Sequence, residues 1–214
     1  MRRAMPLVLM RTTVVLVALI TALALVVVAS AISPKPADAA TKVVTKTFSN
    51  AQQITIPNNS GTAAPYPSER SVQGFNQGTI LDVNLSLKNF SHTFPDDVDV
   101  LLSKTGKTRT VMSDVGGGSP VNNITLNLDD ESPNGFLPDN GPLVGGRFKP
   151  TNQEGLDFFP DPTPSPSAQS ALSGFDGINP NGVWKVRVVD DFPAADGGAF
   201  AGGWSITIKA RVQT

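Results

Sequence analysis

Apolar and polar residues alternate with a period of two in five stretches of the chain. Each stretch places its apolar side chains on one face and its polar or charged side chains on the other, which is the pattern of a half-buried β-strand. These stretches are residues 80–88, 98–102, 124–128, 184–188 and 204–212. Weaker strand candidates cover residues 41–48, 53–57, 108–112 and 146–149. The best helical stripe is short, at residues 168–172. The pattern therefore predicts an all-β chain.

Turn clusters rich in Asn, Gly and Pro separate the predicted strands, for example at residues 57–61 and 179–182. Strands with one wet face must bury their other faces together, and two packed sheets achieve this. A closed barrel is the alternative, but the long irregular connections favour an antiparallel β-sandwich of about eight to nine strands. The chain after residue 39 is long enough to bury one sizeable core without disulfides.

Two segments interrupt the strand pattern. Residues 60–71 are polar and contain proline, which indicates a loop joining an N-terminal part, residues 40–71, to the main body, residues 72–214. Residues 159–166 alternate proline with other residues, and proline cannot donate to a strand ladder. We expect this second segment to be a stiff, exposed loop, and a docking ligand for a partner is the alternative.

Aromatic residues fall into two groups. Trp184 and Trp204 begin alternating runs, which favours anchors in the core over platforms for stacking sugars. Four phenylalanines in predicted loops are the better candidates for an exposed binding surface: Phe158, Phe159, Phe192 and Phe200.

Residues 1–39 carry the features of a secretory signal peptide. Three arginines precede an uncharged apolar run at residues 13–31, and Ala-x-Ala sequences follow at residues 29–31 and 37–39. We expect cleavage near Ala31 or Ala39/Ala40 and therefore a secreted, extracellular protein. An uncleaved anchor is the alternative, and only in that case would the protein be bound to a membrane.

The composition excludes several classes of function. The chain contains no Cys and a single His, His92, which excludes thiol catalysis, a Cys-ligated zinc site and a multi-His metal cluster. Residues 1–39 hold four of the 17 basic and one of the 18 acidic residues, so the remainder carries 13 basic and 17 acidic residues. Nucleic-acid binding needs a basic face, and this balance argues against it.

Catalytic constellations are poorly supported. His92 could be grouped with Asp97 and Ser91 into a triad, but the chain has no Gly-x-Ser-x-Gly elbow to present a nucleophile. We expect His92 to be a structural residue that bonds its own loop at the end of a strand. Paired carboxylates for glycoside hydrolysis also lack a supporting motif. We therefore expect no catalytic residues and no enzymatic activity.

An ordered series of motifs covers most of the chain after residue 74. It includes Asp82-Val83-Asn84-Leu85, Ser91-His92-Thr93-Phe94, Asp97-Val98-Asp99-Val100, Asp129-Asp130-Glu131, Asn181-Gly182-Val183-Trp184, Asp190-Asp191 and Gly203-Trp204-Ser205-Ile206. In order and spacing this series resembles the P-domain, or Homo B domain, of subtilisin-like proprotein convertases and bacterial subtilases. The resemblance implies a jelly-roll-like, galactose-binding-domain-like β-sandwich without catalytic residues, which supports a protease domain. The stretch at residues 41–71 is too short to be that protease domain.

Acidic clusters at the ends of predicted strands suggest a calcium site. Ca²⁺ takes six to eight oxygen ligands, which loops can supply from carboxylates, carbonyls and water. Bacterial P-domains hold calcium in this way, and the matching motifs place the ligands here on Asp97, Asp99, Asp129, Asp130 and Asp190. The alternative is that these aspartates cap turns or keep the loops solvated.

Three classes of function remain open. The first is a secreted accessory or binding module, linked to an exported subtilisin-type protease. The second is a jelly-roll module that binds carbohydrate or a cell surface. The third is a degenerate or split component of a serine endopeptidase. Fold class alone does not choose among them.

Overall fold

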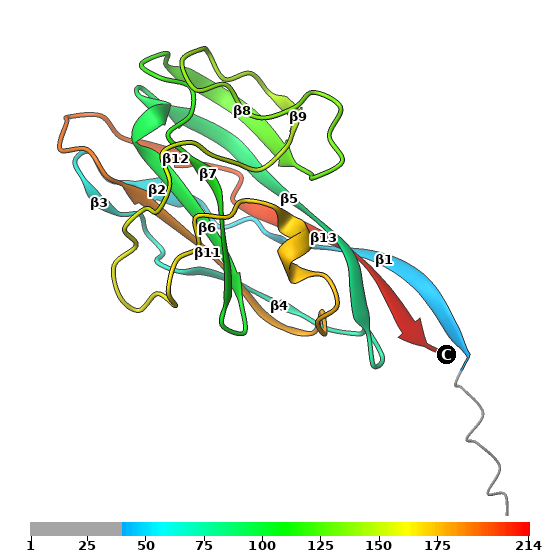
Figure 1. Cartoon of the computed structure of the whole chain (residues 1–214). Helices are drawn as coiled ribbons and strands as arrows, with labels where there is room; N and C mark the ends of the chain where they lie inside the picture. The colour runs from blue at the N-terminus through cyan, green and yellow to red at the C-terminus, as the bar shows by residue number, and fades with distance from the viewer. Residues whose placement is uncertain (1–39) are drawn as a thin grey trace, which may run out of the picture. The chain divides into compact units, whose positions relative to one another are not determined.

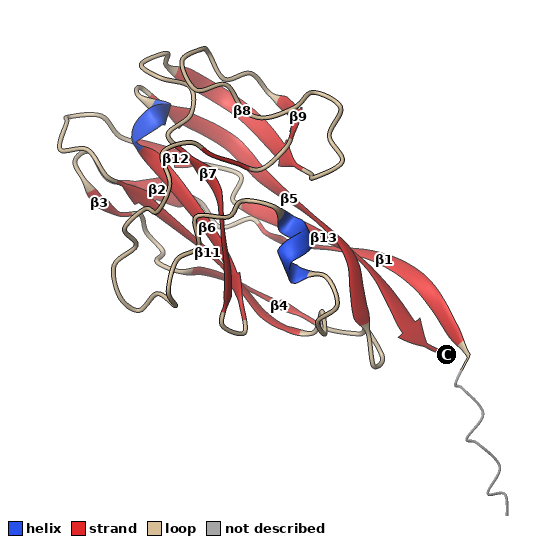
Figure 2. Cartoon of the chain, in the orientation of Figure 1, coloured by secondary structure: helices blue, strands red, loops and turns tan. Residues whose placement is uncertain are grey.

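Two β-sheets pack face to face in the computed structural model, which describes residues 40–214 (Figure 1). The predicted signal peptide or anchor lies in residues 1–39, outside the described residues. No helix within residues 40–214 is long and apolar enough to cross a membrane. Figure 2 shows that strands and loops make up nearly all of the described chain.

The first sheet is built around the long strand β5. On one edge of β5 lie β13 and then β12, which pair in turn with β1 and β2, and on the other edge lie β8 and then β9. Its strands are β1 (Thr41–Asn50), β2 (Ile54–Ile56), β5 (Thr79–His92), β8 (Val121–Leu128), β9 (Gly146–Phe148), β12 (Gly198–Phe200) and β13 (Trp204–Gln213).

The second sheet has β11 and β6 at its centre. The order runs β10, β7, β6 and β11, and both β3 and β4 pair with the remaining edge of β11. Its strands are β3 (Gly61–Thr62), β4 (Ser68–Val72), β6 (Val98–Lys104), β7 (Lys107–Ser113), β10 (Thr151–Asn152) and β11 (Gly182–Asp190). Two short 3₁₀ turns complete the described chain, η1 (Pro95–Asp97) and η2 (Leu172–Phe175).

The predicted β-sandwich is confirmed, and every alternating stretch and weaker candidate lies on a strand. The structure adds four short strands that the pattern does not reveal, namely β3, β4, β10 and β12. The interpretation of residues 60–71 as a loop is wrong at β3 and β4, because Ser68–Val72 pairs along β11. Glu69 and Arg70 of β4 lie on an edge strand, where polar residues are tolerated on both faces. The sheets are mixed, since β8–β9 and β7–β10 pair in parallel.

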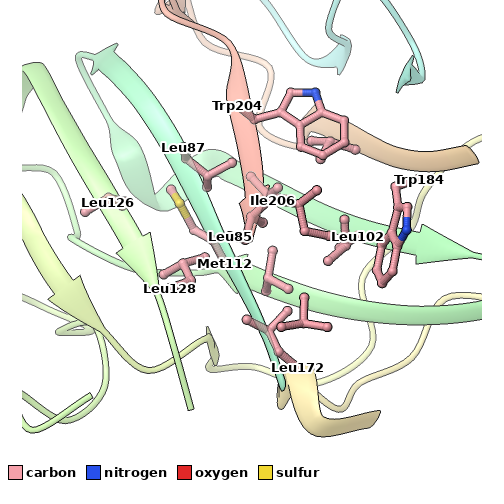
Figure 3. Close-up of a cluster of buried hydrophobic side chains, with 14 of the residues drawn as sticks. Leu85, Leu87, Leu102, Met112, Leu126, Leu128, Leu172, Trp184, Trp204 and Ile206 are labelled. Atoms are coloured by element: carbon pink, nitrogen blue, oxygen red, sulfur yellow. The ribbon is translucent and has the colours of Figure 1, made fainter. Parts of the chain in front are cut away.

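The apolar faces of the two sheets form one continuous core (Figure 3). Leu85 and Leu87 of β5 pack with Leu102 of β6, and the two tryptophans close the core, fully buried as predicted. Each indole N–H has an acceptor: that of Trp184 donates to the Pro180 carbonyl at 3.0 Å and that of Trp204 to Ser68 Oγ at 2.9 Å. Buried indoles require such partners, so these two bonds remove the cost of burying a polar atom.

The proline-rich loop covers the outer face of the second sheet, contrary to expectation. The proline-rich loop, expected to be exposed, packs its Phe159 against Leu101, Val189 and Tyr66 on this face. Phe200 is also buried, within β12 and the core, so of the four candidate surface phenylalanines only Phe158 and Phe192 are strongly exposed. The loop lacks N–H donors at its prolines but offers carbonyls, and side chains of the sheet donate to them: Thr108 to Ser165, Thr110 to Ser167 and Arg187 to Pro162. A proline-rich segment can therefore cover a sheet by accepting hydrogen bonds alone.

Candidate metal centre

Three aspartates from separate segments converge where the two sheets meet. Asp97 ends η1, Asp190 ends β11, and Asp196 lies in the loop that carries the chain from β11 of one sheet to β12 of the other (Figure 1). All three are buried, and one carboxylate oxygen from each lies within 4.8 Å of the others. We call this group the first carboxylate cluster.

The carboxylate oxygens of this cluster are poorly satisfied. Asp97 Oδ2, Asp190 Oδ2 and Asp196 Oδ1 are buried and accept no hydrogen bond from residues 40–214, whereas Asp190 Oδ1 accepts one from the Phe192 N–H at 3.3 Å. His92 Nε2 lies 3.4 Å from Asp190 Oδ2, within ion-pair range but too poorly placed for a hydrogen bond. Native proteins rarely leave buried polar atoms without partners, so these three oxygens are candidates for binding a cation.

The electrostatics of the cluster agree with its geometry. Burial and the nearby carboxylate of Asp196 raise the pKa of Asp97 to about 7. Burial also raises the pKa of Asp190, although the charge of His92 acts in the opposite direction. Carboxylates that are costly to ionise alone are strong ligands once a cation compensates them.

A second group of three aspartates, the second carboxylate cluster, lies at the same end of the second sheet. Asp99 is on β6, Asp114 follows β7 and Asp157 follows β10, and one carboxylate oxygen from each lies within 4.8 Å of the others. Asp157 Oδ2 is buried and has no hydrogen-bond partner in the described part of the chain, and Ser113 Oγ donates to Asp114 Oδ2 at 2.6 Å. Burial, followed by the charges of Asp157 and Asp191, raises the pKa of Asp99 to about 9.

The spacing within both clusters fits a calcium ion. Two oxygens bound to the same Ca²⁺ at about 2.4 Å lie at most about 4.8 Å apart, so one ion can contact all three carboxylates of a cluster. Each cluster would supply three of the six to eight ligands, and backbone carbonyls and water would supply the others. The charge of Asp191 also raises the pKa values of both Asp97 and Asp99.

An open cavity of about 330 Å³ adjoins the first cluster. Phe94 and Phe192, both exposed, line it together with Asp97, Asp196 and Ala194. Gly198 allows β12 to lie close to β5 at this edge, since a Cβ at Gly198 would lie 2.0 Å from the Ser91 carbonyl oxygen. Solvent, and hence a hydrated cation, can reach the carboxylates from this side.

Two of the predicted ligands lie elsewhere. Asp129 Oδ2 accepts a hydrogen bond from Arg147 Nε at 2.8 Å, and Asp130 accepts from the N–H groups of Leu172 at 2.9 Å and Ser173 at 2.8 Å. The structure does not group Asp129 and Asp130 with Asp97 and Asp190, and calcium binding by these two residues stays a prediction. Asp129 is paired with the Arg147 guanidinium, and Asp130 caps the first turn of η2. The contacts of Asp130 agree with the alternative interpretation, in which the aspartates cap turns.

The structure thus divides the five predicted ligands. Asp97 and Asp190 belong to the first cluster and Asp99 to the second. The sequence analysis missed Asp157 and Asp196. Asp196 carried a weak signal, because only four residues separate it from Asp190-Asp191 and Gly197-Gly198 follows it. Asp157 gave none: a long loop brings it beside β6, and no local pattern encodes that contact.

The contacts of His92 are those expected of a structural residue. Its Nδ1 lies 2.9 Å from the Phe94 carbonyl oxygen and 3.2 Å from the Phe94 nitrogen, so the ring bonds its own loop. Ser91 Oγ, the other member of the hypothetical triad, accepts a hydrogen bond from the Asn123 N–H at 2.8 Å. Comparison of this chain with family models, with curated proteins and with solved structures returned no match.

Proposed function

We propose that the protein is a secreted, non-catalytic β-sandwich module stabilised by calcium. The two carboxylate clusters carry this proposal, because one buried carboxylate oxygen on each of Asp97, Asp157, Asp190 and Asp196 has no hydrogen-bond partner among the described residues. Asp97, Asp190 and Asp196 would hold one ion, and Asp99, Asp114 and Asp157 a second. The ions would join η1, the end of β11 and the β11–β12 loop to each other, and β6 to the loop after β10.

Calcium would act here as a structural cross-link. An ion that binds only the folded state adds about 2.7 kcal/mol of stability when its concentration is a hundredfold above Kd. The chain segments that meet at the clusters are loops and strand ends, and loops are the parts of a protein that open most readily. The ions therefore hold together an end of the sandwich where carboxylate repulsion alone would drive the segments apart.

The biological role we propose is that of an accessory domain in exported subtilisin-type proteolysis. The ordered motifs that resemble P-domains support it, and so does the β-sandwich itself. Capture experiments with the tagged secreted chain, followed by labelling of active serine hydrolases with a fluorophosphonate, test this role. We expect a labelled protease to be retained in calcium. Retention of no labelled protein would contradict the accessory role while leaving the calcium sites untouched.

The calcium proposal is tested by thermal unfolding of the secreted chain with excess Ca²⁺ and with EDTA. We expect calcium to raise Tm by about 5–10 °C, since about 1 kcal/mol corresponds to 2–4 °C in a domain of this size. Mg²⁺ at the same concentration is the control, because it prefers a smaller and stricter octahedral site. Equal melting temperatures in calcium and EDTA would overturn the proposal.

A further inference from the structure

The open cavity beside the first carboxylate cluster has a lining that suits one kind of ligand. We call it the acidic cavity. Six residues of the described chain line it: Phe94, Asp96, Asp97, Phe192, Ala194 and Asp196. Their side chains are phenyl rings, carboxylates and one methyl group, and none of these is a hydrogen-bond donor when the carboxylates are ionised. A ligand that fits the lining must therefore bring both donors and apolar surface.

The protein does not compensate the negative charge of the acidic cavity. Asp97 and Asp196 are 7 % and 8 % exposed, and each keeps a buried carboxylate oxygen without a hydrogen-bond partner in residues 40–214. No Lys or Arg of these residues forms an ion pair with Asp96, Asp97 or Asp196. A calcium ion in the first cluster would offset only two of the four charges that these three aspartates and Asp190 carry. The remaining charge attracts a further cation and repels an anion.

The glycine-rich turn at residues 116–118 positions two of the lining residues. The Gly117 N–H donates to Asp96 Oδ1 at 3.2 Å, which orients this carboxylate and leaves Oδ2 for a ligand. A Cβ at Gly118 would lie 2.8 Å from Phe94 Cε2, so the Phe94 ring rests on this glycine. Phe94 is nevertheless 41 % exposed. Because these groups are already held in place, a ligand that binds them orders little of the protein.

These features select among the classes of ligand. Carboxylates and phosphates are repelled by the remaining negative charge. A neutral sugar can stack on a phenyl ring, but its hydroxyls use donors as well as acceptors, and the lining side chains offer acceptors alone. A guanidinium group has five donors and no acceptor, stays charged and stacks on aromatic faces. The volume of about 330 Å³ is at the lower end for ligand pockets, which suits one side chain.

We propose that the acidic cavity binds an arginine side chain of a partner polypeptide. The guanidinium donates to the carboxylates of Asp96 and Asp196 and stacks on Phe192, which is 57 % exposed. One oxygen of each clustered carboxylate suffices for the calcium ion, so the ion and the guanidinium can be bound together. The class of partner, a protein, rests on the accessory role proposed above, and the cavity adds the side chain by which that protein is recognised.

The test is an NMR titration of the isotope-labelled secreted chain in excess calcium. The probes are blocked Gly-Gly-X-Gly-Gly peptides in which X is arginine, lysine or citrulline, which keeps the shape of arginine without its charge. We expect the arginine peptide to bind in the millimolar range and to shift the amide signals of residues 94–97 and 192–196. The lysine peptide should bind about threefold more weakly, because an ammonium group does not stack as a plane, and the citrulline peptide at least about tenfold more weakly.

Two variants remove the proposed contacts. Phe192→Ala and Asp96→Asn should each weaken binding of the arginine peptide about five- to tenfold. An Asn side chain still accepts from the Gly117 N–H, so Asp96→Asn keeps the turn. The matched controls are Phe136→Ala and Asp176→Asn, which change an exposed phenylalanine and an exposed aspartate outside the cavity and should leave the affinity unchanged.

Three outcomes would overturn the proposal. The first is equal affinity for the arginine and citrulline peptides. The second is affinity for the arginine peptide that survives both Phe192→Ala and Asp96→Asn, in variants that melt as the parent does. The third is a shift of the same amide signals by glucose but not by the arginine peptide. Protease capture and calcium melts have other readouts, so a failure of the accessory role or of the calcium sites is distinguishable from a failure of the arginine site.

Discussion

Two acidic regions of this molecule have similar compositions but differ in whether their carboxylates have partners. At Asp129 and Asp130 each carboxylate is satisfied within the protein, by Arg147 in one case and by backbone N–H groups in the other. In the first carboxylate cluster, Asp97, Asp190 and Asp196 keep buried oxygens that have no hydrogen-bond partner within the described chain. Clustered aspartates therefore indicate a cation site only where the fold places no hydrogen-bond donor or basic side chain against their carboxylates.

The largest expected effect comes from removing one ligand of the first cluster. Asp97→Asn keeps the shape of the side chain but removes the charge, so in excess calcium we expect up to about 3 kcal/mol less stability than in the parent. In EDTA we expect the variant to be as stable as the parent or slightly more stable, because repulsion with Asp190 and Asp196 is relieved. Thermal melts of both proteins in both buffers measure this.

The matched control for this variant is Asp176→Asn, which changes an exposed aspartate outside both clusters. It should shift Tm little in either buffer. If Asp97→Asn responded to calcium as strongly as the parent does, the first cluster would not be a calcium site.

A smaller effect is expected at the satisfied region. Arg147→Ala leaves Asp129 buried without its cation, which should cost about 1–2 kcal/mol because the Arg147 side chain is itself half exposed and its pairing is screened. The loss should be equal in calcium and in EDTA, as measured by chemical denaturation. A loss confined to EDTA would mean that calcium also binds at Asp129, and the contrast between the two regions would fail.

The strands were predictable because their signal is local. Each alternating run records which face of a strand is buried, so the sandwich and both tryptophan anchors follow from neighbouring residues. The partners of carboxylates are not local: Arg147 reaches Asp129 from β9, and Asp157 reaches Asp99 from a loop about sixty residues away along the chain. Sequence reasoning therefore found acidic strand ends but could not sort them into satisfied and unsatisfied groups.

The burial of Arg187 was unpredictable for a related reason. Its position on the polar face of an alternating run predicts exposure to water, and the proline-rich loop that covers it bonds through carbonyls, which all residue types share. Phe159 was misplaced with it, since only the folded loop brings Phe159 against Leu101.

The stability of the metal-free protein should also depend on pH. Burial raises the pKa of Asp97 to about 7 and that of Asp99 to about 9, both above the value of about 4 in an unfolded chain. Between these values the folded metal-free protein binds more protons than the unfolded chain, so its stability should fall as pH rises through the folded pKa values. The calcium-induced rise in Tm should accordingly grow between about pH 5 and about pH 8. A metal-free protein that became more stable over this range would contradict the assigned environment of these carboxylates.

Isothermal titration of the metal-free secreted chain with Ca²⁺ tests the central claim most directly, because it counts ions. The two carboxylate clusters predict two bound ions per chain, with one lost in Asp97→Asn and the other in Asp157→Asn, and both retained in Asp130→Asn. An absence of binding at millimolar calcium, or a stoichiometry that only Asp130→Asn lowers, would contradict the account.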